Sequence, residues 1–142
     1  MLVQQVMTRY PVTVNVDTTL GEALKMMHDG QFHHLPVINR DVSLIGVLSE
    51  RDIRHALNIA VLDQQPAQLT ALERTVRSAM TLAPIVVEPN TSVWEAGKLM
   101  LHYRIGCLPV IRGETVIGII TRSDILKSLL HDSDSGETGA TP

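Results

Sequence analysis

The chain has 142 residues, of which 44% are hydrophobic, 19% charged and 3% aromatic. This length suits one ordinary domain or two small units with a shared core, and the hydrophobic fraction excludes a disordered chain. The chain has 12 Lys and Arg and 15 Asp and Glu, so we expect no polybasic face for binding nucleic acid or a membrane. The scarcity of aromatic side chains disfavours RNA-binding modules that stack bases on exposed rings.

The first half of the chain predicts a β-α-β-β-α unit. The alternation over Val12–Val16 predicts a half-buried strand, and Thr19–Glu22 fits the capping box that opens a helix. Apolar residues at helical spacing follow, at Leu20, Ala23, Leu24 and Met27. Two short strands and a second helix, beginning near Glu50, complete the unit; the strands are expected at Leu35–Asn39 and Leu44–Leu48.

The second half repeats this pattern. Leu-Pro-Val-Ile occurs at Leu35–Ile38 and again at Leu108–Ile111, and Ile45-Gly46 recurs as Ile117-Gly118. Between the copies, Asp63–Pro66 predicts a turn that leads into a short helix. The predicted organisation is a first repeat, a linker, a second repeat and a disordered acidic tail, at residues 1–58, 59–75, 76–131 and 132–142.

Cys107 is the single cysteine, so the chain forms no internal disulfide and requires no oxidising compartment. The first residues lack the basic and apolar regions of a signal peptide. No apolar run approaches the roughly 18–20 residues that span a bilayer. We therefore expect a cytoplasmic protein that does not associate with membranes.

Each half of the chain resembles the cystathionine β-synthase (CBS) domain. The resemblance rests on Leu-Pro-Val, a hairpin and then Gly-Val-Leu-Ser-Glu-Arg-Asp-Ile in the first half or Gly-Ile-Ile-Thr-Arg-Ser-Asp-Ile in the second. Two copies in tandem resemble a CBS pair, or Bateman module, over residues 1–131. Ile105–Val110 and the start of the chain look most like the CBS pairs of bacterial acetoin-utilisation proteins. The resemblance implies an α+β fold of two repeats packed with pseudo-twofold symmetry, clefts between them for AMP, ADP or ATP, and a homodimer.

The resemblance also implies ribose-binding residues where each repeat's last strand meets its last helix. In the family, the hydroxyl and carboxylate of a Thr/Ser-x-x-Asp pattern hold the ligand ribose; here they are Ser49 with Asp52, and Thr121 with Asp124. The alternative is a capping box, although such boxes favour the longer Glu or Gln at the last position.

The residues before Leu-Pro border the base in the family, and basic residues there reach phosphate. Gly106 permits close approach of a ligand to the backbone, and His33 occupies the equivalent place in the first repeat. His33 and its neighbour His34 point to opposite faces of a regular strand and cannot share one metal ion, so we expect no metal site. Cys107 follows Gly106 and borders the same pocket, or is simply a buried thiol.

Thr13 and Val86 flank the adenine in the family, and plain strand residues are the alternative. Arg51 and Arg122 stand at the helix starts, where they neutralise phosphate or are solvated surface charges. Trp94 stands where the first repeat has Gly21, and the sequence leaves open whether it serves an interface or packs under a loop.

Catalytic motifs are absent from the sequence: it has no glycine-rich phosphate loop with its lysine, no His-Glu-x-x-His, and no nucleophile with a partner histidine. We expect a non-catalytic module that senses an adenine nucleotide and signals to an unidentified effector protein. Two alternatives stay open: a structural dimerisation module without ligand, and a sensor of S-adenosylmethionine or a cyclic dinucleotide.

Overall fold

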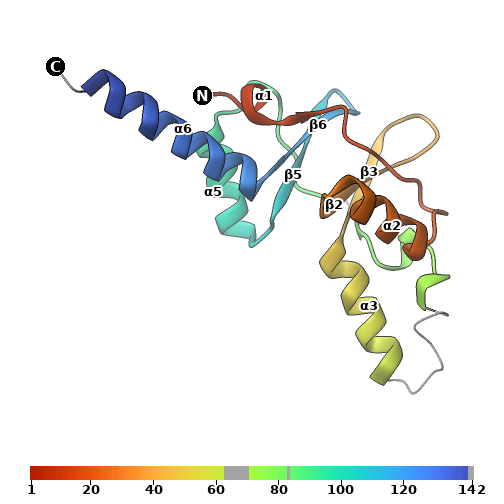
Figure 1. The fold of residues 1–142 in the computed structure, drawn as a ribbon. Helices are drawn as coiled ribbons and strands as arrows, with labels where there is room; N and C mark the ends of the chain where they lie inside the picture. The colour runs from red at the N-terminus through yellow and green to blue at the C-terminus, as the bar shows by residue number, and fades with distance from the viewer. Residues whose placement is uncertain (63–70, 83, 141–142) are drawn as a thin grey trace. The chain divides into compact units, whose positions relative to one another are not determined.

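The computed structural model describes residues 1–62, 71–82 and 84–140 and has an α+β fold with two three-stranded antiparallel sheets (Figure 1). The chain divides into two compact units. The first-repeat unit takes residues 11–84 and 114–116, and the second-repeat unit takes residues 1–10, 85–113 and 117–142.

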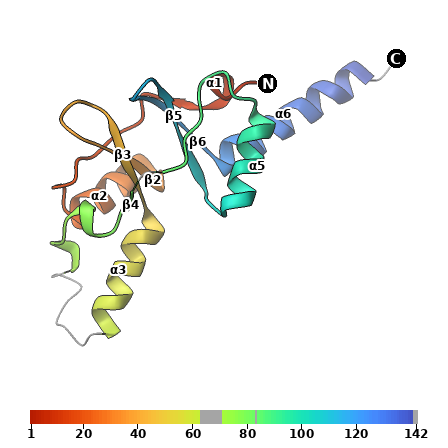
Figure 2. The ribbon, with the colours of Figure 1, turned by 180° about the vertical axis from the view of Figure 1, so that it is seen from behind.

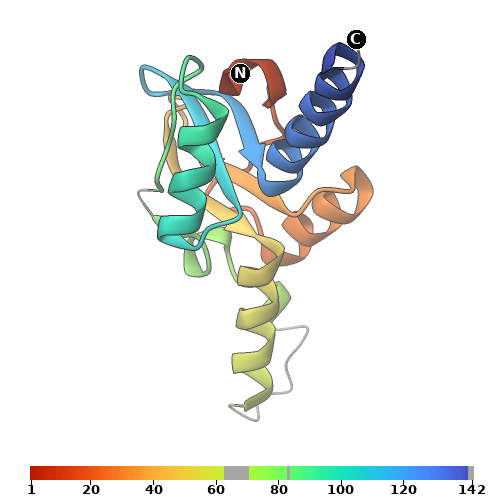
Figure 3. The same ribbon diagram turned by 90° about the vertical axis from the view of Figure 1, so that its left-hand side faces the viewer.

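In the first-repeat unit, the sheet has the order β2-β3-β4. Helix α2 contacts both β2 and α3, and α3 extends away from the end of β3 (Figure 3). Leu20, Leu35, Leu48 and Ile53 are fully buried and bring the two helices and the two long strands into one aliphatic core. The elements are α2 Leu20–Gly30, β2 His34–Ile38, β3 Leu44–Ser49, α3 Glu50–Leu62, the 3-10 helix η1 Val76–Ser78 and β4 Thr81–Leu82.

The second-repeat unit has the same plan, with a sheet of order β1-β6-β5. Helix α5 contacts β5 and α6 (Figure 2). Its core is formed by Val3, Met100, Leu108, Val110 and Ile120, all nearly or fully buried. The elements are α1 Val3–Val6, β1 Thr8–Arg9, α5 Val93–Tyr103, β5 Cys107–Arg112, β6 Thr115–Thr121 and α6 Arg122–Ala140.

The predicted starts of the first helices are confirmed in both repeats. The Thr19 hydroxyl accepts a hydrogen bond from the Glu22 amide at 3.1 Å, and the Ser92 hydroxyl accepts one from the Glu95 amide at 3.0 Å. Each bond satisfies an amide that has no partner within its helix. The hairpins β2–β3 and β5–β6 also form where the sequence predicts them.

The strand predicted over Val12–Val16 is wrong, because only Val14 forms a bridge, to Val37 of β2. The Asn15 side chain accepts hydrogen bonds from the amides of Asp17 and Thr18, and this turn ends the extended segment. In the second repeat, Val87 bridges Val110 in the same parallel manner.

Two further predictions concern connecting segments. The turn expected at Asp63–Pro66 lies outside the described residues. Helix α6 continues through residues 132–140, which belong to the tail predicted from the sequence; the disorder of that tail stays a prediction.

The segment that opens each repeat packs in the unit of the other repeat. Thr8 and Arg9 of β1 pair with Ile119 and Gly118 of β6. In the same way, β4 pairs with β3 through Gly46↔Leu82 and Val47↔Thr81. Each sheet therefore gains its third strand from a distant part of the sequence.

Candidate functional site

The first candidate site lies where β3 ends and α3 begins. The Ser49 amide donates to Asp52 Oδ2 at 2.8 Å, and the Asp52 amide donates to Ser49 Oγ at 3.0 Å. Both side chains are part-buried. We call Ser49 and Asp52 the first box.

The second box, Thr121 and Asp124, occupies the same place between β6 and α6. The Thr121 amide donates to Asp124 Oδ2 at 2.9 Å, and the Thr121 hydroxyl donates to the same oxygen at 3.1 Å. The Asp124 amide approaches Thr121 Oγ1 at 3.4 Å. The hydroxyl and carboxylate are thus held together at the helix start.

Both boxes therefore cap their helices, and the preference for Glu or Gln in such boxes does not exclude Asp here. Capping occupies Oδ2 of each aspartate. A carboxylate has about four lone-pair positions, so Oδ1 retains acceptor capacity in each box. Among the described residues, no hydrogen bond to Oδ1 of Asp52 or Asp124 is formed. Capping and ligand binding are compatible roles for the same side chain.

Next to the first box, Glu50 joins two basic side chains that sequence reasoning did not connect. Glu50 Oε2 lies 2.6 Å from His33 Nδ1, and its Oε1 accepts from the Arg54 guanidinium at 2.6 Å. The hydrogen bond with His33, together with the positive charge of Arg54, lowers the pKa of Glu50 below 4.5. The spacing of Glu50 and Arg54, four residues along a helix, is the signal that predicts this pair.

We predict a small, pH-dependent loss of stability for Glu50→Gln. Because the pKa of Glu50 is lowered in the folded chain, the stabilising contribution is complete above pH 4.5 and is lost as the pH falls further. Thermal melts at neutral pH should place the variant slightly below the wild type, and the gap should close towards pH 3. Glu95→Gln is the control, because Glu95 forms no ion pair among the described residues. A gap that widens in acid contradicts the assignment.

In both repeats, the residue before β2 or β5 forms a backbone hydrogen bond with the first residue of the helix that follows the box. The His33 carbonyl accepts from the Glu50 amide at 2.9 Å, and the Gly106 carbonyl accepts from the Arg122 amide at 3.1 Å. His33 and Gly106, predicted from sequence to line a ligand pocket, are thus brought to the starts of α3 and α6. The His33 side chain is 73% exposed.

The remaining predicted residues are placed as follows. His34 and Cys107 are the first residues of β2 and β5, and Cys107 is buried. Thr13 and Val86 are half-buried beside the bridging residues Val14 and Val87. Arg51 and Arg122 are exposed in the first turns of α3 and α6. The position after the box hydroxyl thus carries the acid Glu50 in one repeat and the base Arg122 in the other.

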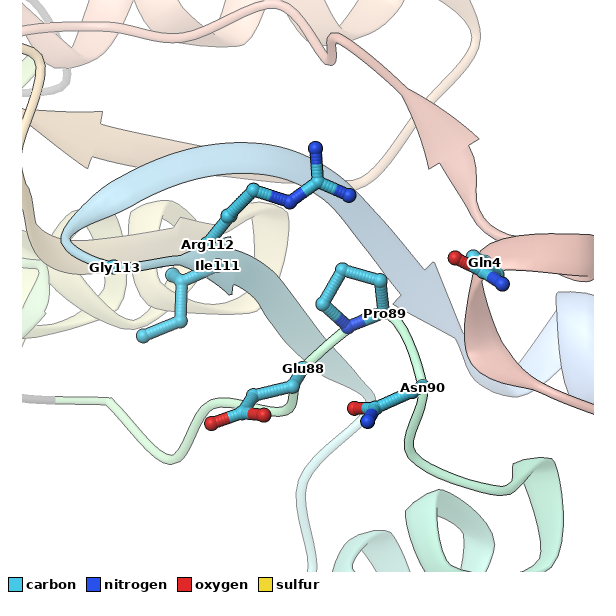
Figure 4. Close-up of a pocket in the computed structure, with 7 residues that line it drawn as sticks. All are labelled: Gln4, Glu88, Pro89, Asn90, Ile111, Arg112 and Gly113. Atoms are coloured by element: carbon cyan, nitrogen blue, oxygen red, sulfur yellow. The ribbon is translucent and has the colours of Figure 1, made fainter.

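Figure 4 shows a separate hollow of about 400 Å³ in the second-repeat unit, at the turn between β5 and β6. The side chains of Glu88 and Arg112 point away from one another across it. It includes none of the residues predicted to bind ligand; its lining is Gln4, Glu88, Pro89, Asn90, Ile111, Arg112 and Gly113.

Over the described residues, no cluster of three His, Cys, Asp or Glu side chains is arranged to hold a metal ion. Within the same ranges, no helix has the length and apolar character needed to cross a membrane.

Comparison with known families identifies the two repeats. The model of the CBS domain matches residues 3–59 and again residues 76–131. A CBS domain-containing protein of Dictyostelium discoideum is 38% identical over 132 residues, with 91% of each chain covered.

Solved structures match the fold over almost the whole chain. A candidate acetoin utilization protein (AcuB) of Vibrio cholerae has a TM-score of 0.80 at 29% identity, covering 97% of this chain and 96% of that one. CBSX2 in complex with AMP has a TM-score of 0.78 at 27% identity, covering 93% and 98%. The CBS domain pair of MJ0100, in complex with 5′-methylthioadenosine and S-adenosyl-L-methionine, has a TM-score of 0.80 at 26% identity, covering 93% and 98%.

Proposed function

The chain belongs to the CBS-domain family as a tandem pair, and from this we propose that it is a non-catalytic sensor of adenine nucleotides of the AMP, ADP or ATP type. The observation that carries the proposal is the chemistry shared by the ligands of its structural relatives. AMP, 5′-methylthioadenosine and S-adenosyl-L-methionine all contain adenosine, and they are bound by CBS pairs that match more than nine-tenths of this chain.

The boxes supply suitable groups for a ribose. Its 2′ and 3′ hydroxyls sit on adjacent carbons and donate to the two oxygens of one carboxylate, or to one oxygen with two free lone pairs. Asp52 and Asp124 each keep Oδ1 available while Oδ2 caps the helix. We assign ribose binding to both aspartates, with Ser49 and Thr121 holding them in place.

The rest of the ligand is assigned to the surrounding groups. Gly106 and Cys107 in one repeat, and His33 and His34 in the other, border the base, and Thr13 and Val86 flank it. Arg51 and Arg122 are exposed beside helix starts, where backbone amides and the helix dipole attract phosphate. Because the chain offers few aromatic residues, aliphatic walls have to hold the adenine.

Regulation follows from differential affinity. A ligand that binds one arrangement of the chain better shifts the population towards it, by no more than the difference between its two affinities. We propose that a homodimer of the chain passes this change to an effector protein. S-adenosyl-L-methionine is the second ligand candidate, favoured by its presence in the MJ0100 complex.

Calorimetric titration of the full chain with AMP, ADP, ATP and S-adenosyl-L-methionine tests the proposal. We expect saturable binding of at least one of them at sub-millimolar concentration. The matched control is 2′,3′-dideoxyadenosine monophosphate, which keeps the base and phosphate but lacks both ribose hydroxyls, and it should bind at least about tenfold more weakly. Absence of binding by every adenosine ligand would leave only a structural module, and equal binding of the dideoxy nucleotide contradicts the ribose assignment.

A further inference from the structure

The two boxes share a hydroxyl and a carboxylate but differ in charge at the position that follows the hydroxyl. Glu50 occupies this position in the first box, and Arg122 occupies it in the second. The Glu50 amide donates to the His33 carbonyl at 2.9 Å, and the Arg122 amide donates to the Gly106 carbonyl at 3.1 Å. The two backbones are therefore equivalent here, and the difference lies in the side chains.

The Glu50 side chain is held beside a residue that the proposed function assigns to the ligand. Its Oε2 lies 2.6 Å from His33 Nδ1, and its Oε1 accepts from the Arg54 guanidinium at 2.6 Å. The hydrogen bond with His33 lowers the pKa of Glu50, so the carboxylate is negatively charged at neutral pH. Its side chain is only 24% exposed. Bonds to two separate segments thus fix a negative charge between the residue before β2 and the first turns of α3.

No member of this ion-pair group recurs in the second repeat. The positions aligned with His33, Glu50 and Arg54 carry a glycine, an arginine and a leucine; they are Gly106, Arg122 and Leu126. Neither glycine nor leucine has a charged group to bind the arginine. Within the ranges that the structure describes, Arg122 forms no ion pair. The second repeat therefore presents an unpaired cation where the first presents an acid bound to two basic side chains.

The remaining cation of the first box, Arg51, does not remove this difference. Residues 50–52 carry two negative charges and one positive charge, whereas residues 122–124 carry one of each. The other two basic side chains near the first box are already bound to Glu50, so a phosphate there must displace its carboxylate or bear its repulsion. At the second box, a phosphate meets the exposed Arg122 guanidinium, which binds phosphate through two parallel hydrogen bonds.

We propose that the two boxes select different classes of adenosine ligand. The first box takes compounds without phosphate on the 5′ carbon of the ribose, and the second box takes 5′-phosphorylated nucleotides. This inference rests on the proposed function and deepens it, because it assigns a ligand class to each repeat. Asp52 and Asp124 hold the same ribose in both boxes, and Glu50 and Arg122 determine which 5′ group is accepted.

The distance over which charges act makes this selection physically reasonable. A ribose is only a few bonds across, so the 5′ phosphate of a nucleotide held by the box aspartate stays near the adjacent side chain. Charges closer than about 8 Å are poorly screened at physiological ionic strength. A carboxylate at that position therefore weakens phosphate binding, and a guanidinium strengthens it, while neither changes the binding of an uncharged nucleoside.

Calorimetric titration with adenosine and AMP tests the proposal, because these two ligands differ only in the 5′ phosphate. Each box is measured in a full chain whose other box is weakened: the first in Asp124→Asn and the second in Asp52→Asn. We define the phosphate preference of a box as its Kd for adenosine divided by its Kd for AMP. The phosphate preference should be at least about tenfold larger at the second box, which is the effect of one hydrogen bond to a charged group.

Exchange of the two charges should exchange the preferences. In the Asp124→Asn chain, Glu50→Arg should raise the phosphate preference of the first box about tenfold, and Glu50→Gln, which changes the shape least, should raise it by a smaller factor. In the Asp52→Asn chain, Arg122→Glu should lower the preference of the second box. The matched control is Asp41→Arg, which makes the same charge change in the exposed turn at the opposite end of the β2–β3 hairpin. This control should leave the phosphate preference unchanged.

The outcomes separate this proposal from the sensor itself. Equal phosphate preference at the two boxes overturns the inference, as does a preference that neither Glu50 variant changes or that Asp41→Arg changes equally. High salt should reduce the difference between the boxes, because ions screen the two charges, and a difference that persists contradicts charge as its cause. If neither adenosine nor AMP binds at either box, the proposed function fails as well. If both bind with equal preference at the two boxes, only the selection by Glu50 and Arg122 fails.

Discussion

Asp124→Asn is expected to weaken adenine-nucleotide binding at the second box by about 10- to 100-fold while leaving the fold intact. A hydrogen bond to a charged group contributes about 1.5–3 kcal/mol, and each 1.4 kcal/mol is a tenfold change in affinity. The substitution removes the charge to which the ribose hydroxyls donate. Calorimetric titration with the tightest-binding nucleotide measures the effect directly.

Asparagine is the informative replacement because Asp124 has two roles. Its Oδ2 accepts from the Thr121 amide at 2.9 Å, and an amide oxygen preserves that acceptor. Asp124→Ala also removes the acceptor of the Thr121 amide and hydroxyl, and a part-buried amide left without a partner costs about 1–3 kcal/mol of stability. The asparagine variant should therefore melt close to the wild type, whereas the alanine variant melts earlier, and both should lose affinity.

Asp52→Asn provides the matched measurement in the first repeat. The first box has the same two bonds from backbone amides, and the residue after its hydroxyl is Glu50, where the second box has Arg122. If both boxes bind a nucleotide, each variant should weaken one of two binding events and leave the affinity of the other unchanged. An Asp124→Asn variant that binds as tightly as the wild type would falsify the ribose assignment and leave capping as the only role of this box.

Local patterns were sufficient to predict most of the fold. The helix starts at Thr19 and Ser92 and the hairpins of both repeats depend on residues close in sequence, so periodicity and capping chemistry predict them. Pairing of β1 with β6 and of β4 with β3 joins segments far apart in the chain, and no local pattern encodes it. The segment around Val14 alternates like a strand, but the Asn15 turn limits it to one bridge.

The part of the candidate site that occurs in both repeats could be predicted from the sequence. The boxes recur in both halves with the same spacing, and this recurrence indicates a shared role for Asp52 and Asp124. The link between His33 and Glu50 joins the residue before one strand to the start of a helix after the next strand, 17 positions later, so it becomes visible only in the folded chain. Aspartate is shorter than the usual Glu or Gln of a capping box, yet the box closes because both of its residues lie at the junction of strand and helix.

Gly46→Ala is expected to destabilise the first-repeat unit by about 1–3 kcal/mol, the usual cost of inserting a methyl group into a packed site. An added Cβ would stand 2.6 Å from the Thr81 carbonyl oxygen and 3.1 Å from Met80 Sδ. The Thr81 oxygen belongs to the backbone of β4, which is paired with β3 at this point. Either β4 separates from the sheet or both strands shift, and urea unfolding followed by circular dichroism should show the loss.

Gly118→Ala is the control that isolates the backbone contact. Gly118 is the aligned position in β6, where the nearest atom to an added Cβ is Met7 Sδ at 2.5 Å and the Thr8 carbonyl oxygen is 3.1 Å away. A methionine side chain has three rotatable bonds and can move aside, and replacing glycine also lowers the entropy of the unfolded chain by the equivalent of about 0.4–1 kcal/mol. The cost at Gly118 should therefore be clearly smaller than at Gly46. Equal losses of stability would contradict this explanation. They would mean that the presence of a third strand limits the size of the residue at this position, whether the nearest atom belongs to its backbone or to a movable side chain.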